Sequence, residues 1–103
     1  MPTTWGHKTW FNYTGNVKKG TRITYGSAPY VVTVTARQYS NLRKHFKGKT
    51  VPVMAGRTTA KAGSIGAWLK KHVTPTAIAS YVAPILILEG YARRISDYRI
   101  EIL

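Results

Sequence analysis

Cysteine is absent from this 103-residue sequence, and acidic residues are scarce, with 3 Asp and Glu against 16 Lys and Arg. The absence of cysteine excludes structural disulfides and thiolate zinc sites, and it is typical of a cytoplasmic protein. A two-metal nuclease needs clustered carboxylates. The only acids, Glu89, Asp97 and Glu101, are instead spread along the last stretch of the chain. This composition argues against hydrolytic metalloenzymes.

Other chemical and targeting motifs are missing as well. The histidines at positions 7, 45 and 72 lack a close ligand spacing for a metal. No glycine loop followed by Lys and Ser or Thr is present to cradle phosphates. The longest mostly apolar run, residues 77–88, is too short to cross a bilayer, and the N-terminus has no signal core. We therefore expect no enzymatic activity, no cofactor, no metal and no membrane insertion.

The excess of basic residues is the strongest feature that is present. The formal net charge is +13, which a polyanion partner would offset while releasing counterions. Hydrophobic residues make up 44% and aromatic residues 12%, enough for a packed core rather than a disordered basic tail. These numbers predict a nucleic-acid partner. A ribosome-associated role, an anionic membrane and incidental basicity are the alternatives.

Residues 1–34 are expected to form an N-terminal aromatic and basic β extension. They are dotted with glycine and show no helical period. Two β-branched runs, residues 21–25 and 30–34, flank Gly and Pro and predict a hairpin. The early aromatic residues supply either core area or a platform for stacking bases. They are Trp5, Trp10, Phe11 and Tyr13.

A first helix is expected from Thr35, followed by a short strand. Thr35 and Gln38 have the spacing of a capping box, and Gly48 is a suitable stop. The apolar face of this helix follows the i, i+3, i+7 rule. It consists of Tyr39, Leu42 and Phe46. Residues 50–54 predict a strand, and Pro52 places it at a sheet edge.

Two further helices are predicted. The second begins after Ser64 as N-cap, with an apolar face that includes Trp68 and His72. The third begins at residues 74–75, with Thr as N-cap and Pro at the first helical position, and it ends at Gly90. Its buried face is predicted from the helical period. It comprises Ile78, Tyr81, Val82, Ile85 and Leu86, and Pro84 lies inside the helix.

The C-terminal residues predict a tight hairpin. Residues 92–95 and 98–102 flank a turn at Ser96 and Asp97. Alternation along the second strand points Tyr98 and the following isoleucines inward and Arg99 outward.

The order helix, strand, helix, short turn, helix, hairpin over residues 35–103 resembles a winged helix-turn-helix domain. Residues 64–69, 74–78 and 88–95 carry the resemblance, the last of them entering the hairpin, or wing. The fold class is thus expected to be α+β, a winged helix preceded by an N-terminal β hairpin, in one compact domain. The resemblance implies DNA binding by the third helix and the wing.

The expected DNA contacts fall in three groups. Arginines of the wing reach phosphates or a minor groove. Hydroxyls early in the third helix touch bases, although its outward stripe of small residues holds no Lys or Arg, so base reading is weak. Cations of the loop before the second helix and of that helix follow the phosphate backbone. The wing group is Arg93, Arg94 and Arg99, and the third-helix group is Thr76 and Ser80. The group of the loop and second helix is Arg57, Lys61, Lys70 and Lys71.

The sequence therefore predicts a duplex-DNA-binding protein that acts as a transcriptional regulator or architectural factor. We expect phosphate-dominated binding with a modest preference for A·T-rich or deformable sites. The expected location is the cytoplasm, in association with the nucleoid if the source is bacterial, archaeal or phage. An RNA- or ribosome-binding module and a protein-interaction winged helix are the alternatives. A homodimer would use residues 1–34 or the small-residue stripe.

Overall fold

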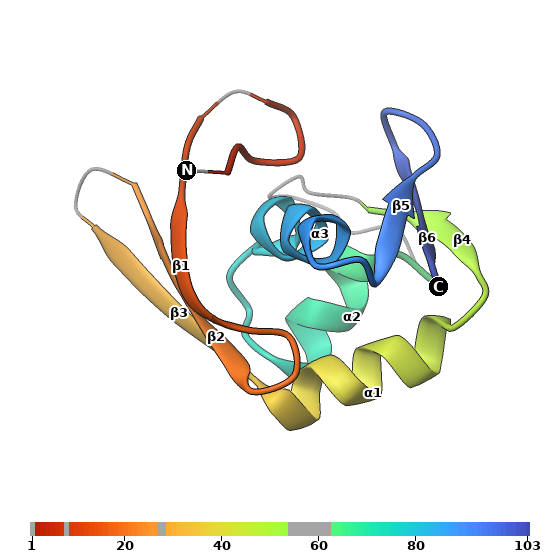
Figure 1. Cartoon of the computed structure of the whole chain (residues 1–103), viewed down its shortest axis with the longest axis horizontal. Helices are drawn as coiled ribbons and strands as arrows, with labels where there is room; N and C mark the ends of the chain where they lie inside the picture. The colour runs from red at the N-terminus through yellow and green to blue at the C-terminus, as the bar shows by residue number, and fades with distance from the viewer. Residues whose placement is uncertain (1, 8, 27–28, 54–62) are drawn as a thin grey trace.

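Two antiparallel sheets flank a central helix in the computed structural model (Figure 1), which describes residues 2–7, 9–26, 29–53 and 63–103. The N-terminal sheet has the order β1-β2-β3, with β1 Asn12–Asn16, β2 Gly20–Tyr25 and β3 Tyr30–Thr35. The C-terminal sheet has the order β4-β6-β5, with β4 Thr50–Pro52, β5 Ala92–Arg94 and β6 Arg99–Ile102. The helices are α1 Ala36–Phe46, α2 Ile65–His72 and α3 Ala79–Leu88. The described chain is thus a small α+β domain.

The predicted N-terminal hairpin is confirmed as β2 and β3, but a third strand, β1, joins it. The sequence Asn-Tyr-Thr-Gly-Asn lacks the β-branched pattern of a strand, which is why β1 escaped prediction. Gly15 has φ of 83°, and a Cβ there would lie 2.2 Å from the Gly20 carbonyl oxygen. Glycine is therefore required where β1 closes onto β2.

The predicted capping box starts α1. The Gln38 amide donates to Thr35 Oγ1 at 3.1 Å, and the Thr35 amide donates to Gln38 Oε1 at 2.8 Å. The three residues expected on the inner face of α1 are all buried. Because Thr35 also ends β3, the capping box joins the N-terminal sheet directly to α1.

Helix α2 begins as predicted, with Ser64 Oγ accepting the Ala67 amide at 3.0 Å. Its buried face, however, is Ile65, Gly66 and Leu69, while Trp68 is only partly buried and His72 is exposed. The expected burial of Trp68 and His72 was therefore wrong. The Gly66 amide donates to the Val53 carbonyl at 2.9 Å, and this bond orients α2 with Gly66 inward, toward the end of β4.

Helix α3 begins at Ala79, not at residues 74–75 as predicted. The Thr74 side chain instead accepts the Thr76 amide in a turn, and Ile78 caps the helix without a side-chain bond. Pro84 has no amide to donate to the Ser80 carbonyl four residues earlier. The Trp5 amide donates to that carbonyl at 2.9 Å, so residues 2–7 pack against the helix where proline leaves a free acceptor.

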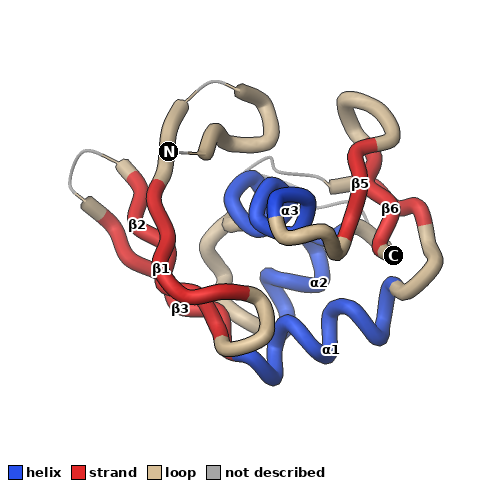
Figure 2. Tube along the Cα trace, in the orientation of Figure 1, coloured by secondary structure: helices blue, strands red, loops and turns tan. Residues whose placement is uncertain are grey.

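Helix α3 is enclosed between the two sheets (Figure 2). Ala79 and Ala83, expected on an outward stripe, are 1% and 0% exposed, and Ser80 and Ile87 are partly buried. The outward stripe was therefore wrong for the two alanines. Small side chains here allow close approach of the covering elements rather than access to a partner.

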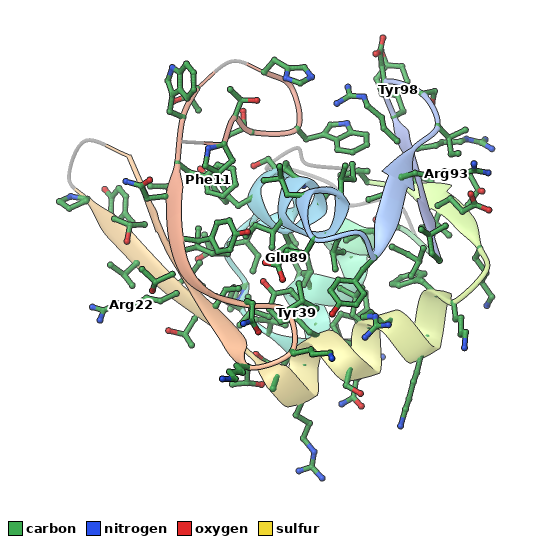
Figure 3. All side chains as sticks on the ribbon, in the orientation of Figure 1. Phe11, Arg22, Tyr39, Glu89, Arg93 and Tyr98 are labelled. Atoms are coloured by element: carbon green, nitrogen blue, oxygen red, sulfur yellow. The ribbon has the colours of Figure 1, made fainter. Side chains whose placement is uncertain are left out.

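Glu89, directly after α3, links that helix to the N-terminal sheet. Its carboxylate accepts the Tyr13 hydroxyl at 2.9 Å and the Val17 amide at 2.8 Å. Glu89 is partly buried, and its label in Figure 3 lies between α3 and Tyr39 of α1. Burial, the Glu89 hydrogen bond and the Glu89 charge raise the pKa of Tyr13 to about 12.

Alkaline pH is therefore expected to weaken the fold. A tyrosine in the unfolded chain titrates near 10, so the protonated Tyr13 stabilises the fold below that pH. This stability is lost as pH rises from about 10 through about 12, and denaturant melts should show the free energy of unfolding falling there. Tyr13→Phe should flatten the decline only partly, because burial also raises the pKa of Tyr39 and Tyr81. If the free energy of unfolding of Tyr13→Phe falls as steeply as that of the wild type, titration of Tyr13 does not cause the fall.

Candidate nucleic-acid interface

The residues predicted around the third helix do not form a reading face. Thr76 is exposed but lies in the turn before α3. Ser80 is in the first turn, partly buried, with its carbonyl engaged by Trp5. Because sheets and residues 2–7 enclose α3, this helix cannot enter a major groove in this arrangement. Arg57 and Lys61 lie outside the described residues.

Two of the three wing arginines are engaged within the protein. Arg93 forms an ion pair with Glu101 across the hairpin. Arg94 stacks over the Trp5 ring at 4.1 Å and donates to the Trp5 carbonyl at 2.9 Å. Of the three wing arginines, Arg99 alone is exposed and has no carboxylate within 4 Å among the described residues.

The other expectations for the wing are partly confirmed and partly wrong. Arg94 is not a free surface charge, because Trp5 fills the space between α3 and the wing and its indole nitrogen donates to the Asp97 carbonyl at 2.7 Å. Tyr98 is 77% exposed, although alternation predicted burial, while Ile100 and Ile102 are fully buried as expected. Figure 3 shows Tyr98 at the tip of the hairpin and Arg93 on its flank. DNA contact by Arg93 and Arg99 stays a prediction.

The acidic residues leave most of the positive surface uncompensated. Glu89 is used in the interior, Glu101 pairs with Arg93, and Asp97 lies 3.6 Å from Arg94. A set of exposed cations therefore has no carboxylate within 4 Å in the described part of the chain. They are Lys18, Lys19, Arg22, Arg37, Lys44, Lys47, Lys49, Lys71 and Arg99.

A hollow of about 460 Å³ lies between α1 and α2. Its lining combines planar rings with side-chain amides: Gln38, Asn41, His45, Trp68 and His72. The Trp68 ring centroid is 4.5 Å from that of His72 and 6.5 Å from that of His45. Gln38 Nε2 donates to the His72 carbonyl at 3.4 Å and so ties the two helices together.

Three exposed cations lie one helical turn from residues that line this hollow. At 100° per residue, Arg37 and Lys44 follow Asn41 toward the solvent side of α1. By the same geometry Lys71 follows Trp68 on α2, whereas Lys70 is partly buried on the other flank of that helix. We call the hollow and its rim of Arg37, Lys44 and Lys71 the α1–α2 surface.

Sequence reasoning identified Lys71 but missed the rest of the α1–α2 surface. Arg37, Asn41 and Lys44 could be placed on the outer side of a helix from their period. The sequence carried no indication that α2 would lie beside them, because the contact joins residues more than thirty positions apart.

Rings, amides and lysines can hold a planar, anionic ligand by stacking, hydrogen bonds and charge. The described residues offer no metal site, because they contain no group of three or more His, Asp or Glu side chains able to hold an ion. Within the described ranges, no helix has the length and apolar character to cross a membrane.

No protein-family model, curated protein or solved structure matches this chain.

Proposed function

We propose that this protein binds nucleic acid, and duplex DNA in particular, mainly through the phosphates. The observation that carries the proposal is the large set of exposed cations without carboxylate partners in the described chain. Nine such side chains, on strands, turns and helices alike, repel one another at low salt. A polyanion relieves that repulsion and releases its own counterions.

The proposed fold is a winged helix-turn-helix with an added N-terminal sheet. The element order α1-β4-α2-α3-β5-β6 supports it, as does the pairing of β4 with the C-terminal hairpin. The enclosure of α3 argues against base reading by that helix. We therefore centre the phosphate contacts on the α1–α2 surface, with further contacts from exposed cations outside it, and favour an architectural factor over a regulator with a long specific site.

The salt dependence of binding tests this proposal. With contacts to about five to eight phosphates, log K should fall against log salt with a slope of roughly −4 to −7. Fluorescence anisotropy with a short random duplex at several salt concentrations gives the slope directly. A slope near −1 would show that the charge does not serve nucleic-acid binding.

Single-stranded nucleic acid, RNA included, is the second candidate. Trp68 is partly exposed in the hollow, and Trp10 is 62% exposed, so rings are available for stacking bases. Duplex DNA, single-stranded DNA and structured RNA should be compared at one salt concentration. Tighter binding of a single strand, with quenching of tryptophan fluorescence, would replace the duplex proposal.

A further inference from the structure

Strand β3 forms one of the two edges of the N-terminal sheet, opposite β1. It pairs with β2 on one side, and no backbone hydrogen bond joins residues 30–34 to any other described segment. An antiparallel strand directs the N–H and C=O groups of alternate residues to each side. One row of these groups on β3 therefore has no backbone partner.

This edge lacks the usual protection against pairing. Exposed edges are normally blunted by charged residues, proline, bulges or a covering segment. The strand reads Tyr-Val-Val-Thr-Val-Thr, and residues 23–36 contain no charged residue at all. Tyr30 and Val31 are nevertheless 59% and 48% exposed.

The missing charges have no explanation within a single copy of the chain. The other long uncharged stretch, residues 73–88, contains α3, half of whose residues are buried in the core. Strand β3 has no such reason, because its apolar and threonine side chains face solvent at positions 30, 31, 33 and 35. In a chain of net charge +13, a cation-free exposed strand marks where another positive surface can approach.

We propose that β3 pairs antiparallel with β3 of a second copy of this chain. The two three-stranded sheets would then form one six-stranded sheet across a two-fold axis. A two-fold contact requires a self-complementary patch, which an antiparallel pair of identical strands supplies. Nucleic acid fits the β3 edge less well than a second copy does, because phosphates bind cations and β3 has none. This inference does not rest on the proposed function.

A matched pair of lysine substitutions tests the interface. Thr14 on β1 and Thr33 on β3 are both exposed, and each lies directly opposite Arg22 on β2. Thr14→Lys and Thr33→Lys thus add the same charge beside the same arginine, but on opposite edges of the sheet, so only the second lies at the proposed β3 contact. Sedimentation equilibrium without nucleic acid should show a concentration-dependent dimer for the wild type and for Thr14→Lys. Thr33→Lys should raise the dimer dissociation constant at least tenfold.

Two results would overturn the proposal. One is a wild-type protein that stays monomeric at several hundred micromolar. The other is equal weakening by both lysines, which would be a net-charge effect. Thermal melts followed by circular dichroism report whether each variant is folded.

Cysteine substitutions give an independent test if Thr33→Lys fails to fold. The natural sequence has no cysteine, so Thr33→Cys carries a single thiol. A short thiol cross-linker should join two copies of Thr33→Cys across the axis. Thr14→Cys should not be joined, since five strand spacings would separate the two β1 strands by about 24 Å. Absence of a cross-linked Thr33→Cys dimer would equally exclude the pairing.

Discussion

Replacing Arg37, Lys44 and Lys71 together with alanine is expected to weaken duplex DNA binding by roughly 100-fold or more near 0.1 M salt. These three side chains lie one helical turn from residues that line the hollow between α1 and α2, and they have no carboxylate within 4 Å among the described residues. Each lost phosphate contact removes about 0.9 from the slope of log K against log salt. The triple variant should therefore flatten the slope by about 2.7.

The matched control removes three exposed cations from elsewhere. Lys18, Arg22 and Lys49 lie on the β1–β2 turn, on β2 and before β4, and their replacement lowers the net charge by the same amount. This control should lose far less affinity, because its cations are not on the α1–α2 surface. Both triple variants should melt near the wild-type temperature, since exposed charges contribute little to stability. Equal loss in both would mean that only net charge matters and would remove the α1–α2 surface as the interface.

Short-range signals in the sequence predicted structure well. The Thr35–Gln38 box and the Ser64 cap were correct because a helix start depends on side chains within three residues of each other. The buried Ile100 and Ile102 were correct because strand alternation is also local.

Long-range contacts explain the misses. The pattern at residues 74–75 fits a helix start, yet the turn there ends only where Ile78 enters the core. Arg94 looked like a free wing charge, but its partner Trp5 is 89 positions away. The α1–α2 surface was missed for the same reason: neither helix alone shows the hollow that the pair encloses. Periodicity assigns faces to elements, but it does not say which faces meet.

Trp5→Ala is expected to destabilise the fold by about 3–5 kcal/mol, the range for removing a buried tryptophan. Trp5 is 6% exposed, and its indole nitrogen donates to the Asp97 carbonyl while its ring lies under the Arg94 guanidinium. Alanine leaves a cavity between α3 and the wing, an unpaired Asp97 carbonyl, and an Arg94 without its stacking partner. The loss is a large fraction of the 5–15 kcal/mol that holds a typical domain folded.

Trp10→Ala is the natural comparison, because it is the same substitution five residues later on a side chain that is 62% exposed. Surface changes of this kind usually stay within about 0.5 kcal/mol. Melting curves should therefore separate the variants, with Trp5→Ala lower by roughly 12–40 °C at 4–8 °C per kcal/mol. Arg94→Ala should also destabilise the fold, but by less than Trp5→Ala. It removes the stacking and the bond to the Trp5 carbonyl but keeps the indole buried.

If Trp5→Ala and Trp10→Ala melt together near the wild-type temperature, residues 2–7 do not cover α3 in solution. The helix would then be open to a partner, and the assignment of DNA contacts to the α1–α2 surface would lose its main steric argument.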